Sequence, residues 1–316
     1  MGSALEKVGD LGDNTPVNLH GVLIPITTPF RNDEIDLDAL RFNLERWNRT
    51  GVAGYVVLGS TGEAPYLDDD EGARVIAAAR AAVPRDRAFV VGTGRESTRA
   101  TMLATRRAAD LGADAVLVRT PSYYRAQLTS DRIAAHFEAV ADGSPVPVLL
   151  YNFPQVTGIN LEPAVARRLA RHQRILGIKD SLGDVGQVAA LARPWTPEDD
   201  PGRPFEILVG SASTFYPSLC VGAMGGILAF ANVAPEPSVR LHHLATTGQH
   251  EAARHLQARI TPLAQATTTR FGIGGLKAAM DLAGFRGGRP RAPLASCPPA
   301  AIEELRTLLN ALELLP

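Results

Sequence analysis

Short apolar runs alternate with helical stretches along nearly the whole chain, and this alternation constrains the fold more than any other feature of the sequence. The apolar runs are hydrophobic at successive positions, as strands are when helices cover both faces of a parallel sheet. Eight strand–helix units recur at a spacing of roughly 30 residues, which is typical of a (β/α)8 barrel, or TIM barrel, of the α/β class. The expected strands are Gly21–Ile26, Gly54–Leu58, Ala88–Gly92, Ala115–Arg119, Val146–Tyr151, Leu176–Lys179, Glu206–Val209 and Gly226–Phe230.

Helical stretches rich in Ala, Arg and Leu follow these strands. They are Asp36–Thr50, Asp68–Ala82, Ser97–Leu111, Ser130–Ala141, Glu162–Arg171, Val185–Ala192, Ser213–Val221 and Pro237–Thr247. A doubly wound sheet is the alternative, but it has fewer strands, and Thr27–Phe30 after the first strand is no glycine-rich fingerprint.

We expect three regions along the chain. Residues 1–18 are polar and form a flexible tail, residues 19–248 form the barrel, and residues 249–316 form a C-terminal helical extension. The expected helices of the extension are Gln249–Thr268, Gly274–Ala283 and Pro299–Leu314.

The composition excludes several classes of function. The net charge is −1 over 316 residues, and the arginines are interspersed with acids, so nucleic acid is not an expected partner. No apolar run spans a membrane and none resembles a signal peptide, so we expect a cytoplasmic protein. Cys220 and Cys297 form no CxxC motif, and no histidine ends a predicted strand; neither a disulfide framework nor a metal site is expected.

Lysine is rare in this chain, and one lysine stands at the end of a predicted strand. The 32 basic residues include only Lys7, Lys179 and Lys277 as lysines. Arginine keeps its proton and cannot be a nucleophilic amine, whereas burial of a lysine disfavours its charged form. Lys179 follows an apolar strand and is therefore the candidate for a Schiff base with a ketone; a surface lysine at a strand end is the alternative.

Other polar groups follow neighbouring strands, where barrel enzymes place their chemistry. The loop Gly59–Glu63 (GSTGE) combines small residues with two hydroxyl groups, which suits a carboxylate, although such a sequence is also an ordinary turn. Tyr151 ends the strand before that of Lys179. A Schiff-base mechanism requires an amine, a group that moves protons and donors for a carboxylate, and these segments supply one of each.

Four segments resemble the dihydrodipicolinate synthase / N-acetylneuraminate lyase family, and the resemblance covers about residues 18–313. They are Gly21–Phe30 (GVLIPITTPF), Gly59–Glu63 (GSTGE), Tyr151–Gly158 (YNFPQVTG) and Gly177–Asp180 (GIKD). The resemblance implies a barrel with C-terminal helices, usually a homotetramer built as a dimer of dimers, that binds pyruvate or another 2-oxo acid as a Schiff base without a cofactor. It implies that Lys179 is the Schiff-base lysine, that Tyr151 moves protons, and that Ser60 and Thr61 bind the carboxylate.

Further residues enter through the resemblance alone. Tyr123 or Tyr124 corresponds to the tyrosine that reaches a neighbouring subunit's site, and the additional Ser122 leaves the choice open. Ser181 is expected to line the substrate pocket, and Gly210, after the seventh strand, is expected to contact the substrate as well.

One position departs from the pattern of dihydrodipicolinate synthases. They typically carry an arginine two residues after the proline of the YNxP motif, where this chain has Val156. The second half instead resembles the 4-hydroxy-2-oxoglutarate aldolases, and we take the run Phe271–Lys277 to reflect ancestry more than substrate. The matching segments are Lys179–Ser181, Gly183–Val185, Val209–Ala212, Ala231–Val233, Arg270–Lys277, Gly287–Gly288 and Arg291–Leu294.

These resemblances lead us to expect a class I aldolase that cleaves a 4-hydroxy-2-oxo acid, with 4-hydroxy-2-oxoglutarate giving pyruvate and glyoxylate. The first alternative is dihydrodipicolinate synthase itself, which condenses pyruvate with aspartate semialdehyde. A sugar-acid aldolase or dehydratase on the same scaffold and a non-catalytic barrel that binds 2-oxo acids are the others.

Overall fold

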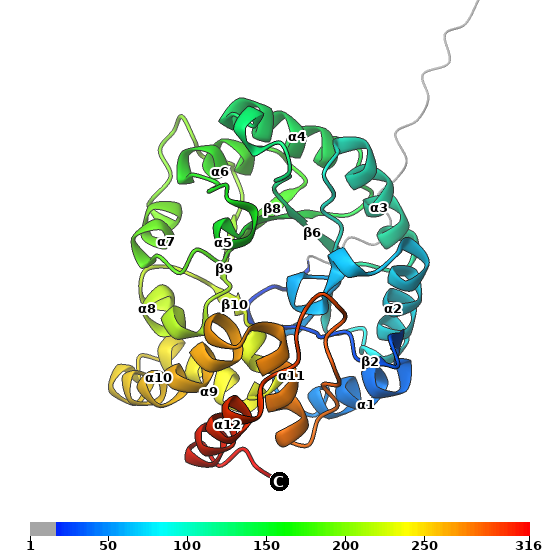
Figure 1. Ribbon diagram of the computed structural model, residues 1–316. Coiled ribbons are helices and arrows are strands. Elements are labelled where there is room, and N and C mark those ends of the chain that lie inside the picture. The colour runs from blue at the N-terminus through cyan, green and yellow to red at the C-terminus, as the bar shows by residue number, and fades with distance from the viewer. Residues whose placement is uncertain (1–16) are drawn as a thin grey trace, which may run out of the picture.

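The computed structural model describes residues 17–316, and its centre is a closed barrel of eight parallel strands. Neighbouring strands follow one another along the chain, and β1 pairs with β10 to close the barrel. In Figure 1 the helices form a ring outside the strands, so the predicted (β/α)8 barrel is confirmed. The barrel strands are β1 (Gly21–Pro25), β4 (Gly54–Val57), β5 (Ala88–Gly92), β6 (Ala115–Arg119), β7 (Val148–Asn152), β8 (Ile175–Asp180), β9 (Glu206–Val209) and β10 (Gly225–Ile227).

The helices of the ring begin where the sequence supplies capping side chains. Asp68 accepts hydrogen bonds from the N–H groups of Asp70 and Glu71 at the start of α2, and Ser97 caps α3 in the same way. The ring contains α1 (Leu37–Trp47), α2 (Asp69–Ala82), α3 (Thr98–Asp110), α4 (Ser130–Asp142), α5 (Pro154–Thr157), α6 (Pro163–Ala170), α7 (Val185–Ala192), α8 (Phe215–Cys220) and α9 (Pro235–Thr246). No helix within residues 17–316 is both long and apolar enough to cross a membrane.

Two apolar layers hold the barrel together, because successive residues of a strand point alternately to the axis and to the helices. The inner layer contains Leu23, Val56, Val90, Leu117, Leu149, Leu208 and Ile227. The outer layer, packed under the helices, contains Val22, Tyr55, Val57, Val91, Val118 and Leu150. This alternation decides which side chains at the strand ends face the mouth of the barrel.

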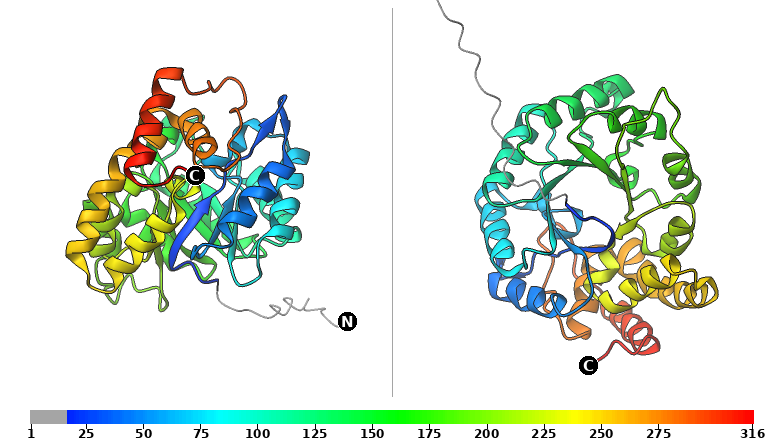
Figure 2. Two further views of the ribbon diagram at one scale, coloured as in Figure 1. Left: turned by 90° about the horizontal axis from the view of Figure 1, so that it is seen from below. Right: turned by 180° about the vertical axis from the view of Figure 1, so that it is seen from behind.

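The C-terminal helices pack against the barrel and share its core. They are α10 (His250–Gln265), the π-helical turn η6 (Ala266–Arg270), α11 (Gly272–Leu282) and α12 (Pro299–Ala311). Leu263, Leu276 and Leu305 belong to the same buried cluster as Leu241 of α9. The side view in Figure 2 places α11 and α12 at the end of the barrel opposite the start of β1, which is the mouth formed by the strand ends. We therefore propose that residues 249–316 extend the barrel instead of forming a separate domain.

Two details differ from the sequence prediction, and one predicted segment lies almost wholly outside the residues that the structure describes. A short hairpin of β2 (Phe30–Arg31) and β3 (Glu34–Ile35) follows β1 and was not predicted. The last strand ends at Ile227 and not at Phe230, because residues 229–232 form the 3₁₀ turn η5 (Ala229–Asn232). The predicted flexible tail lies outside the described residues, except for its last two positions.

Candidate active site

Lys179 lies near the C-terminal end of β8 and is 4% exposed. It stands in register between Tyr151 of β7 and Leu208 of β9, both members of the inner apolar layer. Its side chain therefore points into the barrel, and Nζ lies 4.3 Å from the centroid of the Tyr151 ring. The structure thus brings together the amine and the phenol that the sequence singled out, while their catalytic roles stay a prediction.

The other described lysine, Lys277, has different surroundings. It is fully buried, and its Nζ lies 2.5 Å from Glu63 Oε1 and donates to the carbonyl oxygens of Thr28 (2.8 Å) and Arg289 (3.1 Å). Burial lowers the pKa of Lys277, and the neighbouring Glu63 carboxylate opposes that shift. All three donors of this ammonium group have partners, whereas no salt bridge to Lys179 forms within residues 17–316. Of the two lysines, only Lys179 is placed to act as a nucleophile.

Asp180, directly after Lys179, fixes the end of β8. Its buried carboxylate accepts hydrogen bonds from Asn152 Nδ2 (2.9 Å), Gln187 Nε2 (2.6 Å) and the N–H of Leu182 (2.9 Å). These donors come from β7, α7 and the following loop, and they satisfy the buried charge without another charged group. The network holds the strand end rigid and so restricts where Lys179 can point.

Tyr151 lies between Lys179 and the GSTGE loop. Its ring is 5% exposed and stacks on Phe153 with a centroid separation of 5.6 Å. Its hydroxyl oxygen lies 3.5 Å from Ser60 Oγ, at the outer limit of a hydrogen bond. Tyr151 thus contacts both Lys179 and Ser60, and proton transfer through its hydroxyl group stays a prediction.

The GSTGE loop presents donors to the same space. Ser60, Thr61 and Gly62 form the 3₁₀ turn η1 (Ser60–Gly62), and its first N–H groups have no acceptor within the turn. Thr28 Oγ1 donates to the carbonyl oxygen of Gly62 at 2.7 Å and holds the turn against the end of β1. Ser60 lines the cavity described below, whereas Thr61 is buried and does not, and the roles of both in binding a carboxylate stay a prediction.

The buried carboxylate of Glu63 ties this loop to the C-terminal helices. Glu63 adopts a left-handed backbone conformation (φ 55°), pairs with Lys277, and accepts the N–H of Arg291 at 2.8 Å. The Arg291 guanidinium also binds Glu71 of α2 through two contacts of 2.7 Å, and these hydrogen bonds lower the pKa of Glu71. The sequence interpretation took Phe271–Lys277 to reflect ancestry more than substrate; the structure adds that Lys277 pairs with Glu63 of the loop expected to bind substrate.

Ser181 and Gly210 meet at the ends of β8 and β9. A Cβ added at Gly210 would lie 1.9 Å from Ser181 Oγ, so the close approach of the two strand ends requires glycine there. The N–H of Gly210 donates to the carbonyl oxygen of Asp180 at 2.7 Å. Both predicted residues thus adjoin the segment that carries Lys179, but neither lines the cavity described below.

Tyr123 and Tyr124 do not reach the mouth of their own barrel. They are 80% and 69% exposed and pack edge to face on each other, with ring centroids 5.0 Å apart. The expectation that one of them enters a neighbouring subunit's site stays a prediction, and the structure does not choose between them.

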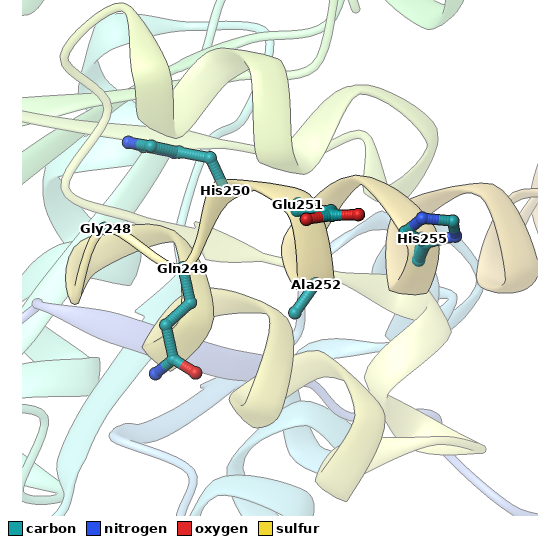
Figure 3. Close-up of a pocket in the computed structure, with 6 residues that line it drawn as sticks. All are labelled: Gly248, Gln249, His250, Glu251, Ala252 and His255. Carbon is teal, nitrogen blue, oxygen red and sulfur yellow. The ribbon is translucent and has the colours of Figure 1, made fainter.

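A cavity of about 270 Å³ opens at the mouth and is lined by Ser60 and Tyr151 together with Arg95, Glu96 and Arg119. Another hollow, of about 540 Å³, lies at the start of α10, and all its lining residues come from positions 248–255. Figure 3 draws these residues. The side chains there point in different directions. Lys179 does not itself line the cavity at the mouth, but Tyr151, whose ring it contacts, does, and we therefore propose that the chemistry takes place there. Among residues 17–316, no group of three or more His, Cys, Asp or Glu side chains is arranged to hold a metal ion.

The three charged residues of this cavity were missed in the sequence. Arg119 Nη2 lies 2.7 Å from Glu96 Oε1. Partial burial acts to raise the pKa of Glu96, but hydrogen bonds from the N–H groups of Ser122 and Tyr123 and from Arg119 lower it to about 2. The sequence places Arg119 at the end of a predicted strand, but only the structure shows that Leu117, two residues before it, faces the axis.

The fold and the arrangement of Lys179, Tyr151 and the GSTGE loop are those expected of a class I, pyruvate-dependent aldolase. The model of the dihydrodipicolinate synthetase family matches residues 18–312, so the chain belongs to that family. The expected lyase class is thereby confirmed at the level of the family.

Individual relatives match over nearly their full length. The 4-hydroxy-tetrahydrodipicolinate synthase of Xanthomonas campestris pv. campestris is 38% identical, covering 95% of this chain and 97% of the relative. The solved dihydrodipicolinate synthase of Acinetobacter baumannii, described as complexed with pyruvate, has a TM-score of 0.86 at 29% identity and covers 94% of this chain and 100% of its own. A structure described as the first monomeric dihydrodipicolinate synthase variant has a TM-score of 0.88 at 30% identity, covering 94% and 97%.

Proposed function

We propose that this protein binds pyruvate as a Schiff base at Lys179 and uses it in aldol chemistry. The observation that carries the proposal is the position of Lys179, buried in the barrel mouth, unpaired with any acid of residues 17–316, and 4.3 Å from the Tyr151 ring centroid. The pyruvate named for the Acinetobacter baumannii relative supports the same 2-oxo acid here.

The proposed reaction begins when Lys179 Nζ attacks the C2 ketone and water is lost to give a protonated imine. The imine accepts the electron pair when C3 loses a proton or when the C3–C4 bond breaks, and an enamine results. In cleavage Tyr151 takes the proton of the C4 hydroxyl as the aldehyde forms, and in condensation it gives a proton to the aldehyde oxygen; the Ser60 hydroxyl exchanges protons with Tyr151. After cleavage the enamine is protonated at C3, and in both directions hydrolysis of the imine releases the product and restores the Lys179 amine. Donors in the turn of Ser60 and Thr61 hold the carboxylate next to the ketone.

Two aldehydes are candidate partners of the enamine, each supported by its own observation. The names of the curated relatives support condensation with aspartate semialdehyde, as in 4-hydroxy-tetrahydrodipicolinate synthase, better than the cleavage of 4-hydroxy-2-oxoglutarate expected from the motifs. Val156 favours the cleavage reaction, because it is 63% exposed and apolar where the synthases typically carry an arginine.

Borohydride trapping tests the covalent step. Wild-type protein incubated with pyruvate and borohydride should gain one reduced pyruvate adduct, which peptide mass spectrometry should locate at Lys179. Lys179→Arg keeps the positive charge but supplies no nucleophilic amine, so it should gain no adduct and lose turnover. Adduct formation or turnover by this variant would refute the assignment. Coupled assays of wild-type protein with aspartate semialdehyde and with 4-hydroxy-2-oxoglutarate then distinguish the two reactions.

We also propose a homotetramer, on the basis of the family resemblance and the exposed pair Tyr123 and Tyr124. The relative described as a monomeric variant has nearly the same fold, so the fold alone does not determine the assembly. Light scattering after size-exclusion chromatography measures the mass directly, and a monomer mass would overturn this proposal.

A further inference from the structure

Arg119 occupies a position in the barrel from which its side chain enters the mouth. It is the last residue of β6 and stands in register with Tyr151, which in turn stands in register with Lys179. Ala115 and Leu117, at alternate positions of the same strand, belong to the inner apolar layer. Arg119 therefore continues the inward face of β6, and it lines the cavity with Tyr151 and Ser60.

The neighbouring chain leaves space for this side chain. A Cβ added at Gly94 would lie 2.7 Å from Arg119 Cγ and 2.7 Å from the backbone nitrogen of Arg119. Such distances are far inside van der Waals contact, so only glycine permits the segment after β5 to approach Arg119 as it does. The arginine stem is thus fixed between this segment and the mouth.

The guanidinium of Arg119 is held in place by two contacts, but some of its N–H groups have no hydrogen-bond partner among the described residues. The guanidinium pairs with Glu96 Oε1 at 2.7 Å and donates to the carbonyl oxygen of Thr120 at 3.0 Å. Within residues 17–316 it makes no other hydrogen bond, and a guanidinium has five N–H donors. Glu96 is itself occupied by the N–H groups of Ser122 and Tyr123, both at 2.9 Å. The side chain is 24% exposed, so donors remain available at the cavity.

We propose that Arg119 binds a second carboxylate, at the aldehyde end of the substrate, and thereby selects 2-oxo diacids. This inference rests on the proposed Schiff base at Lys179. Neighbouring strands lie about 4.8 Å apart, so Lys179 and Arg119, two strands apart, start about 10 Å from each other. Two long side chains directed into the same mouth leave between them a space that a short carbon chain spans. Arginine recognises a carboxylate through parallel hydrogen bonds, which Val156 cannot form.

Selectivity for the second carboxylate can be measured without turnover. The probes are 2-oxoglutarate and 2-oxopentanoate, which have the same carbon chain and differ in the distal carboxylate. In titration calorimetry, the full-length wild-type protein should bind 2-oxoglutarate more tightly than 2-oxopentanoate. In Arg119→Gln that preference should fall about 10- to 100-fold, the loss expected for hydrogen bonds to a charged group, while binding of 2-oxopentanoate stays unchanged. Arg119→Lys should retain part of the preference.

The matched control is Arg95→Gln. Arg95 lines the same cavity, but it lies in the loop after β5 and not at a strand position in register with Tyr151 and Lys179, so this variant should keep the preference for 2-oxoglutarate. The assignment would be overturned if Arg119→Gln weakened the binding of both acids equally or left the preference for 2-oxoglutarate unchanged. It would also be overturned if Arg95→Gln lost that preference. The proposed function fails separately, if wild-type protein shows no borohydride adduct with pyruvate; the calorimetric comparison of the two acids still reports on Arg119 in that case.

Discussion

Replacing Lys277 by methionine removes one half of a fully buried ion pair and leaves the other half in place. Both side chains are 0% exposed, and the charged atoms lie 2.5 Å apart. The Glu63 carboxylate would keep only the N–H of Arg291, and the carbonyl oxygens of Thr28 and Arg289 would lose their donor. Removing one partner of a buried pair typically costs about 3–5 kcal/mol, because the remaining charge stays desolvated. We expect a loss of that size in the free energy of unfolding.

Urea unfolding followed by the fluorescence of buried Trp47 measures this loss. The double variant Glu63→Gln/Lys277→Met removes both charges and should recover at least half of the lost stability, since no unpaired charge remains. Arg270→Met serves as the surface control, because its pair with Glu304 is 49% and 38% exposed, and it should move the unfolding midpoint much less. A loss below about 1 kcal/mol in Lys277→Met, or no recovery in the double variant, would refute the reasoning.

Three further changes test other features. Tyr151→Phe should lower kcat by on the order of 10²–10⁴ without preventing the pyruvate adduct, and steady-state kinetics with a near-wild-type kcat would remove its role in proton transfer. Gly210→Ala should displace Ser181, because the new Cβ would lie 1.9 Å from its Oγ, and with it the strand end that carries Lys179, and should lower kcat/KM; an unchanged kcat/KM would show that this contact does not position the lysine. Burial first, and then the charge of Arg119, lower the pKa of His136 to about 4, while Glu96 opposes the shift. As the pH falls, the His136 imidazole is therefore protonated in the unfolded chain before it is protonated in the folded protein. The free energy of unfolding should fall by up to about 3 kcal/mol as the pH is lowered from 6.5 to about 4. His136→Gln should lose less stability over that range in urea unfolding, and parallel losses would contradict the assignment.

The sequence predicted the barrel well because each of its strands is short, apolar and separated from the next by a helix. Ala88–Gly92, Ala115–Arg119 and Glu206–Val209 match the observed strands residue for residue. The hairpin after β1 was missed because two-residue strands are too short to show an alternating pattern. The end of β10 was placed too late because the apolar run continues into η5, where Asn232 Nδ2 donates to the carbonyl oxygen of Pro25.

The sequence predicted a site residue only where the rarity of its residue type or its position at a strand end pointed to a chemical role. Lys179 stood out because lysine is rare, and Tyr151 because it ends the neighbouring strand. Arg119 was overlooked among 29 arginines, since a charge at a strand end has a meaning only once the inward face of that strand is known. The pairing of Glu63 with Lys277 depends on a contact between opposite ends of the chain, which no local pattern encodes.

The bond from Arg291 to Glu63 joins residues that are 228 positions apart, and it has a consequence for synthesis on the ribosome. A nascent chain that has emerged as far as residue 248 already contains Lys179, Tyr151 and the GSTGE loop, but it lacks Lys277 and Arg291. Glu63 then has neither of these partners, and the loop keeps its hydrogen bond from Thr28 but lacks the contacts that tie it to the C-terminal helices. Activity should therefore appear only after Lys277 and Arg291 have emerged, and chains that end before Lys277 should be inactive although they carry Lys179, Tyr151 and the GSTGE loop.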